Sequence, residues 1–136
     1  MTEMTRPPRR LGRSALALIV GFVASAALSL GTDQILHTLG VFPPPGKPMP
    51  ETDLLLLALS YRLVYDGLGS YVAAWLAPSA PMSHAMLLGA IGQVFALVGI
   101  YVGWNLGPHW YPIALAVSVL PTARIGGWLF TRRRRA

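Results

Sequence analysis

Four long apolar segments alternate with short polar or proline-rich breaks along this chain. The segments cover about residues 14–38, 52–77, 83–105 and 109–130, and proline and glycine mark the breaks at 43–50, 78–81 and 107–108. Each segment has roughly the 20 residues that a helix needs to cross a bilayer, where hydrocarbon offers no partner to exposed backbone groups. The pattern predicts an all-α membrane protein, a four-transmembrane-helix bundle over 14–130 with tails at 1–13 and 131–136.

The composition supports this prediction. Of the 136 residues, 54% are hydrophobic and 12% are charged, and the mean hydropathy is +0.52. Ordinary soluble domains have about 25% charged residues. The chain is short enough for a single domain. It contains no cysteine, which excludes disulfides, thiolate nucleophiles and thiolate metal sites.

The net charge of +6 comes mainly from the two tails, which hold eight of the eleven basic residues. A nucleic-acid binder needs a basic face on a folded surface, whereas these arginines flank hydrocarbon-length segments, so we expect no nucleic-acid partner. Basic flanks stay in the cytoplasm. We therefore expect a protein of the bacterial inner (plasma) membrane type with both termini cytoplasmic, and tails that contact anionic lipid headgroups.

The tryptophans agree with this topology, because tryptophan and tyrosine favour the membrane–water interfaces. Trp104 and Trp110 fall at the predicted outer ends of the third and fourth segments, and Trp75 and Trp128 at inner ends. Arg124 is close enough to the inner end of its segment to extend its side chain to the headgroups.

A second interpretation of the N-terminal segment is open. Arginines, an apolar stretch and then Ala24, Ser25 and Ala26 resemble a signal peptide with a small-residue cleavage site. Cleavage there would leave three spans and an N-terminus outside. Against it, the apolar run continues to Thr32, which is longer than a usual signal peptide core.

Small residues indicate where helices approach closely. Gly89, Gly92, Gly99 and Gly103 fall on one face of the third segment and predict a helix-packing surface. Small residues also recur at near-helical spacing in the first segment (Ala17, Gly21, Ser25 and Ser29) and the second (Gly69, Ala73 and Ala77). The contacts are either within one bundle or between copies in a homo-oligomer.

Ionisable residues inside the predicted spans are the candidate functional site. Asp33 and His37 lie four residues apart in the first segment, and Arg62 and Asp66 four apart in the second, so each pair shares a helix face. We predict a buried network of Asp33, Arg62 and Asp66 with His37 at its outer edge. Its formal charge of −1 would suit an extra proton or a small cation. Alternatively, the network only holds the helices together.

Other chemistry has weaker support. His37 and His109 lie near acidic residues, but no ligand spacing indicates a metal site, and we expect neither metal nor cofactor. His84 is expected to be a first-turn interfacial residue. No nucleophile elbow, phosphate loop or metalloprotease motif is present, so an enzyme is not predicted, although an unrecognised catalytic site is a third possibility.

The sequence favours a small transporter, channel or accessory subunit, with a structural or interaction protein as the alternative. In size and span number the chain resembles small multidrug-resistance transporters and dimeric fluoride channels. The former rely on a glutamate in the first span, and no predicted span here contains one. A transporter predicts a water-accessible cavity that reaches Arg62 and Asp66, whereas a structural protein predicts that these groups are sealed.

Overall fold

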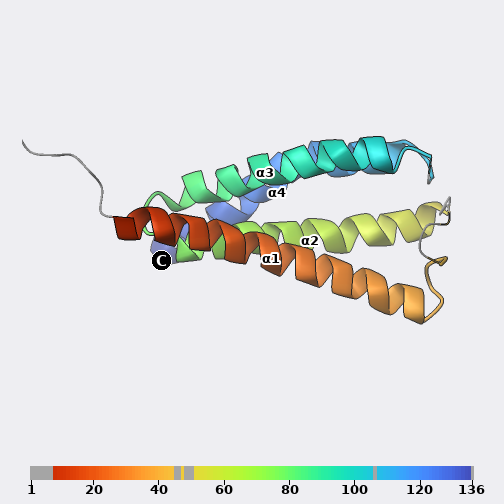
Figure 1. Cartoon of the computed structure of the whole chain (residues 1–136), viewed down its shortest axis with the longest axis horizontal. Coiled ribbons are helices and arrows are strands. Elements are labelled where there is room, and N and C mark those ends of the chain that lie inside the picture. Colours follow the sequence, from red (N-terminus) through yellow and green to blue (C-terminus); the bar gives the residue numbers. More distant parts are fainter. Residues whose placement is uncertain (1–7, 45–46, 48–50, 106, 136) are drawn as a thin grey trace, which may run out of the picture.

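Four helices account for the regular structure. The computed structural model describes residues 8–44, 47, 51–105 and 107–135, with side chains from residue 11 to residue 134. The helices are α1 (Pro8–Thr38), α2 (Thr52–Leu76), α3 (Pro81–Val102) and α4 (Trp110–Arg135). They run up and down, so that α1 begins at the end where α4 finishes (Figure 1). The predicted all-α four-helix bundle is confirmed.

Three of these helices are long and apolar enough to cross a membrane, over Leu11–Thr38, Pro81–Val102 and Trp110–Arg134. The fourth, α2, is 25 residues long, but every 18-residue stretch of it includes both Arg62 and Asp66, which lower its hydropathy. The surface of the bundle is rich in exposed leucine, valine and isoleucine, whereas its core consists mainly of alanine. This distribution suits a protein in contact with lipid, and the chain is a small polytopic membrane protein.

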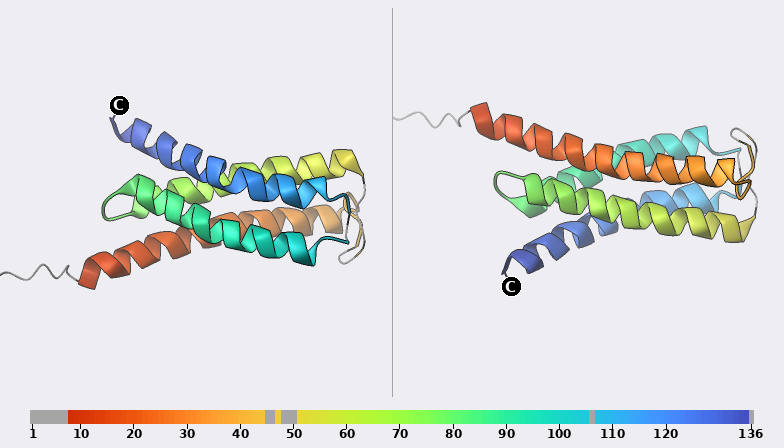
Figure 2. Two further views of the ribbon diagram at one scale, coloured as in Figure 1. Left: turned by 90° about the horizontal axis from the view of Figure 1, so that it is seen from above. Right: turned by 90° about the horizontal axis from the view of Figure 1, so that it is seen from below.

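The helices form an incomplete ring in the order α1, α2, α4, α3. α2 packs along both α1 and α4, and α4 packs along α3. α2 also contacts α3, and α1 and α3 make a smaller contact. Within the described residues, the backbones of α1 and α4 do not approach each other closely. We call the end where α1 begins the tail end and the opposite end, where α1 and α3 finish, the mouth end. The α1–α2 and α3–α4 pairs diverge toward the mouth end (Figure 1). Figure 2 shows that α1 and α4 spread apart at the tail end.

The end of α1 is a glycine turn of the Schellman type. Gly40 has the left-handed φ of 78° that glycine adopts without strain. Its N–H donates to the carbonyl of His37, and the N–H of Val41 donates to the carbonyl of Leu36. The chain therefore reverses sharply, which buries Phe42 against the bundle.

Glycines bring the helices together in the half of the bundle toward the tail end. A Cβ added at Gly21 would lie 2.6 Å from the Gly69 carbonyl oxygen, so α1 and α2 are in backbone contact there. Gly126 of α4 meets the Gly67 carbonyl of α2 in the same way. Gly127 holds α4 close to α3, where a Cβ would lie 2.7 Å from the Ala85 Cβ. Close approach of this kind replaces hydrophobic burial as the stabilising contact between membrane helices.

The face of small residues predicted on the third segment is only partly used. Gly89 and Gly92 approach Ala123 and Val119 of α4. A Cβ on Gly99 would meet nothing within 4 Å, and one on Gly103 would meet only the carbonyl of Gly99 in its own helix. The structure therefore supports no interhelical contact at Gly99 or Gly103 among the described residues, because α3 and α4 together part from α1 and α2 toward the mouth end and these two glycines line the cavity.

Candidate functional site

A cavity of about 740 Å³ lies between the four helices. It is lined by one face of each helix and extends from Lys47 and Pro108 at the mouth end down to Ser70 and Ala123. Sites for small molecules usually have volumes of about 300–1,000 Å³ and are mostly apolar with a few polar groups. Its lining residues from α1 and α2 are Ser25, Ser29, Asp33, His37, Leu55, Ala58, Arg62, Asp66 and Ser70, among others.

Asp33 and Arg62 form an ion pair between α1 and α2. The Arg62 Nη2 donates to Asp33 Oδ2, and the Tyr61 hydroxyl donates to Asp33 Oδ1. Both charged side chains retain access to the cavity, with 31% of the Arg62 side chain and 18% of the Asp33 side chain exposed. The Arg62 Nε is buried and has no hydrogen-bond partner among the described residues. The ion pair directs the Arg62 side chain toward Asp33 and the mouth end.

Asp66 lies apart from this pair, one helical turn further from the mouth. Its Oδ1 accepts a hydrogen bond of 2.7 Å from the Ser25 hydroxyl of α1. Within the described residues, no hydrogen bond or ion pair joins Asp66 to Arg62. The single predicted network of Asp33, Arg62 and Asp66 is thus two separate clusters. The reason is that the guanidinium of Arg62 pairs with one oxygen of Asp33, whose other oxygen accepts the Tyr61 hydroxyl.

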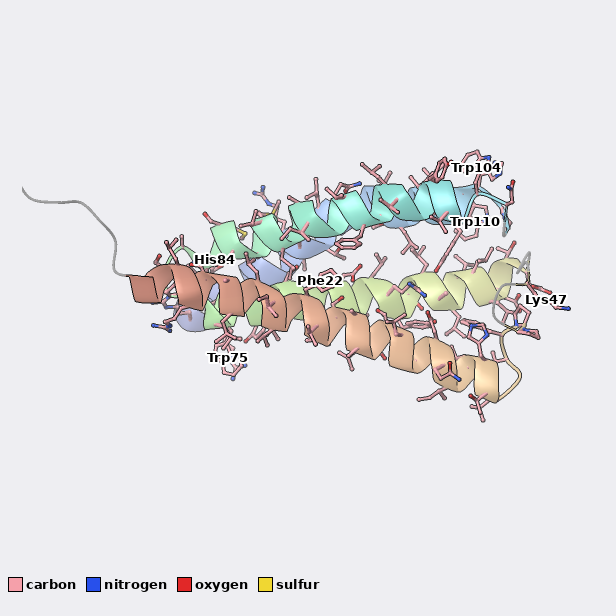
Figure 3. The ribbon with its side chains drawn as sticks, viewed as in Figure 1. Phe22, Lys47, Trp75, His84, Trp104 and Trp110 are labelled. Atoms are coloured by element: carbon pink, nitrogen blue, oxygen red, sulfur yellow. The ribbon has the colours of Figure 1, made fainter. Side chains whose placement is uncertain are left out.

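His37 lies at the rim of the cavity. Its Nδ1 is 2.6 Å from the carbonyl oxygen of Pro43, and its ring meets the edge of Phe42 with centroids 5.5 Å apart. The glycine turn at Gly40 produces both contacts. Lys47 is also at the rim and is exposed (Figure 3). The mouth therefore has a basic group outside the Asp33–Arg62 pair.

The remaining walls are mostly apolar and aromatic. Phe22 of α1 and Phe95 of α3 line the cavity and contact each other, with ring centroids 5.3 Å apart. Phe42 and the half-buried Tyr111 line the part nearer the mouth. A ligand in this cavity would touch aromatic rings on several sides.

The four tryptophans are exposed at the ends of the bundle. Trp104 and Trp110 lie at the mouth end with Lys47, and Trp75 lies toward the tail end (Figure 3). The Arg132 guanidinium carbon lies 5.2 Å from the centre of the Trp128 ring, and Arg124 is exposed on α4. These positions are those that two membrane interfaces require.

The other histidines have structural contacts. The Nε2 of His84 is 2.9 Å from the Ser14 hydroxyl, which joins α3 to α1 at the tail end, and the His109 ring stacks on Trp104 at 3.5 Å. No three histidine, aspartate or glutamate side chains gather to hold a metal ion in the parts of the chain that the structure describes.

Several residues of the site are not evident in the sequence. Ser25 is recognisable as a small residue but not as the partner of Asp66, and Tyr61 is next to Arg62 without any sign that it binds Asp33. Tyr111 joins the cavity only through the position of α4. Gly126 and Gly127 are adjacent in the sequence and bring α4 close to α2 and α3. This glycine pair is the sequence feature that could have indicated the position of α4.

Comparison of the chain with protein-family models, with curated proteins and with solved structures finds no match.

Proposed function

We propose that this protein binds a small polar ligand or cation in the cavity and acts as a small transporter, channel or accessory subunit. The carrying observation is the cavity that extends from the mouth end to Asp66 in the middle of the bundle. By helix rise, Asp66 is about 21 Å from the start of α2 and about 15 Å from its end. Ionisable groups at such depth are costly and usually mark a path for an ion or substrate.

The helices close on one another below the cavity, toward the tail end. Beyond Ser70, the contact of Gly21 with Gly69 closes α1 on α2, and Gly127 with Ala85 closes α4 on α3. We place the arginine-rich tails in the cytoplasm of a bacterial-type cell, so the mouth faces outward. Anionic headgroups on the cytoplasmic side then neutralise the tails. We assign no catalytic reaction to this site.

The second candidate is a structural or interaction protein, alone or as a homo-oligomer. It is favoured by the polar contacts that join α1 to α2: Asp33 with Arg62, Ser25 with Asp66, and Thr32 with Tyr65 at 3.0 Å. If this candidate is correct, the charges only hold a helix pair together and water does not reach Asp66.

Cysteine labelling separates the two candidates, because the natural chain has no cysteine. Ser29 and Ser70 line the cavity, and each is replaced by cysteine in otherwise unchanged protein in sealed vesicles. The control is Ser60→Cys, at an exposed position of α2 outside the cavity lining. A charged, membrane-impermeant methanethiosulfonate reagent is added from the mouth side.

We expect both cavity cysteines to react at least about tenfold faster than the control, since a thiol reacts as the thiolate and needs water to ionise. Slow labelling of the Ser29 and Ser70 variants from either side would refute the binding function and favour the structural candidate. Fast labelling only when the reagent is inside would refute the orientation.

A further inference from the structure

A second, smaller hollow of about 230 Å³ lies between α1 and α3, and we call it the α1–α3 groove. Its lining is entirely apolar and consists of Leu18, Ile19, Phe22 and Val23 of α1 with Leu88, Ile91 and Phe95 of α3. Leu88 is buried at its floor, whereas Ile19 and Phe95 at its rims are each 59% exposed. Phe22 and Phe95 line both this groove and the large cavity, and their rings, 5.3 Å apart, form a wall between the two. The groove therefore lies on the lipid-facing outside of the bundle.

A polar pair closes the groove at the tail end. Ser14 precedes Leu18 by one helical turn, and His84 precedes Leu88 by one turn, so both lie about 6 Å beyond the apolar lining. The His84 Nε2 is 2.9 Å from the Ser14 hydroxyl. In Figure 3, His84 lies toward the tail end from Phe22. The groove thus has an apolar body and a polar head.

The ring of His84 can present a donor to an anion through Ser14. Its Nδ1 is 3.1 Å from the Ala80 carbonyl oxygen, which can only accept, so Nδ1 carries the hydrogen. In the neutral ring Nε2 then accepts from the Ser14 hydroxyl. A protonated ring donates from Nε2 instead, and the hydroxyl hydrogen of Ser14 is then free for an anionic oxygen.

The charge of this half of the bundle is positive. From the tail end up to Asp66, the described part of the chain has arginines but no acidic side chain. Arg13 is next to Ser14, is exposed, and takes part in no ion pair among the described residues. α1 and α3 also both begin at this end, and the start of a helix carries partial positive charge. The polar head of the groove therefore favours an anion.

The lining indicates a hydrocarbon chain rather than another helix. Membrane helices pack closely through glycine, alanine and serine, and the lining of the groove contains none of these. The exposed rims at Ile19, Val23 and Phe95 would hold a rigid helix away from the floor, whereas a flexible chain can lie between them. By helix rise, Ser14 and Val23 are about 14 Å apart along α1, close to half of the roughly 30 Å hydrocarbon core. The groove therefore matches one leaflet in length.

We propose that the α1–α3 groove binds one anionic phospholipid from the leaflet at the tail end. Its phosphate lies at Arg13, Ser14 and His84, and one acyl chain lies along the groove as far as Phe95. This lipid braces α1 against α3, which make a smaller contact with each other than α1 makes with α2. The inference goes beyond the proposed function and does not depend on what the large cavity holds.

The headgroup is tested by native mass spectrometry of the full-length protein in detergent micelles. Phosphatidylglycerol and phosphatidylcholine with identical acyl chains are titrated separately, and the number and affinity of retained lipids are measured. We expect one retained phosphatidylglycerol whose affinity exceeds that of phosphatidylcholine at least about fivefold, because basic groups near a membrane surface attract anionic lipid. Equal affinity for the two lipids would overturn the proposal.

Two arginine variants separate a built site from the general charge of the tail end. Arg13→Gln should lower phosphatidylglycerol affinity at least about threefold. Arg124→Gln removes the same charge from an exposed position on α4, which does not pack against α1, and should bind within about twofold of the natural protein. Equal losses in the two variants, with normal helix content in both, would show general attraction without a site and would overturn the proposal.

The acyl chain is tested with two isoleucines of α1 that are each 59% exposed. Ile19→Trp places a bulky ring at the rim of the groove, and Ile35→Trp places the same ring outside both the groove and the large cavity. We expect at least about a threefold loss of phosphatidylglycerol affinity in the first variant and none in the second. Equal lipid affinity of the two variants would overturn the proposal. A dimer that only Ile19→Trp abolishes, with lipid affinity unchanged, would instead assign the groove to a second copy of the chain.

Discussion

Replacing Gly21 by alanine should destabilise the protein by separating α1 from α2. The new Cβ would lie 2.6 Å from the Gly69 carbonyl oxygen and 3.0 Å from both Ala73 Cβ and Leu88 Cδ2, whereas ordinary contact begins at 3.4 Å. The two backbones must therefore move apart by about 0.8 Å. Ser25, one turn along α1, would be carried with them, and its 2.7 Å hydrogen bond to Asp66 would lengthen to about 3.5 Å.

The magnitude follows from three terms. Overpacking of a tight contact costs about 1–3 kcal/mol. Loss of a hydrogen bond between membrane helices costs about 0.6 kcal/mol. Alanine for glycine in a helix contributes up to about 1 kcal/mol in the opposite direction. Gly31→Ala is the matched control on the same helix, because its Cβ would meet nothing within 4 Å and so only the last term applies.

The helix-propensity term cancels in the comparison of the two variants. We expect Gly21→Ala to be less stable than Gly31→Ala by about 1.5–3.5 kcal/mol. The measurement is the free energy of unfolding in mixed micelles as dodecyl sulfate is increased, with helix content followed by circular dichroism. Equal stability of the two variants would show that α1 and α2 do not approach at Gly21, and the account of the closed half of the cavity would be wrong.

Three further outcomes are expected. Asp33→Asn should reduce the free energy of unfolding by about 1–3 kcal/mol in the micelle assay, since Arg62 then loses its charged partner between α1 and α2; unchanged stability would argue against this ion pair. Replacing the arginines at 132–134 by glutamine should place part of the protein in the membrane in the opposite orientation, which a C-terminal topology reporter would detect. If all molecules keep one orientation, this tail does not determine the topology. His84→Ala should reduce the free energy of unfolding by about 0.6–1 kcal/mol in the micelle assay through loss of its bond to Ser14, and a stability equal to that of the natural protein would argue against this link between α3 and α1.

The sequence predicted the helices well because the physical constraint on them is local. A backbone in hydrocarbon must satisfy its own hydrogen bonds, so apolar length and proline-containing breaks are enough to locate each helix. The second segment shows the limit of this reasoning. Arg62 and Asp66 leave it without a stretch as apolar as those of the other three helices, yet it contacts every other helix of the bundle.

The site was predictable as a set of residues but not as a set of contacts. Helical spacing placed Arg62 and Asp66 on one face, and helix rise placed Asp33 within reach of an arginine. Which acid the arginine pairs with depends on how α1 is turned toward α2, and this is fixed by the contact of Gly21 with Gly69 and by the hydroxyls of Tyr61 and Ser25. Spacing along one chain contains no information about rotation between two helices.

The sequence by itself therefore determined that this is a small α-helical membrane protein with acidic and basic groups inside its spans. Only the tertiary structure decided that the helices close on one another near Gly21 and Gly127 and part near Gly99, although all three are glycines in apolar helices. The physical reason is that a glycine permits close approach but does not require it. Whether two helices meet there depends on the crossing angles of the whole bundle, and those angles create the cavity that leads to Asp66.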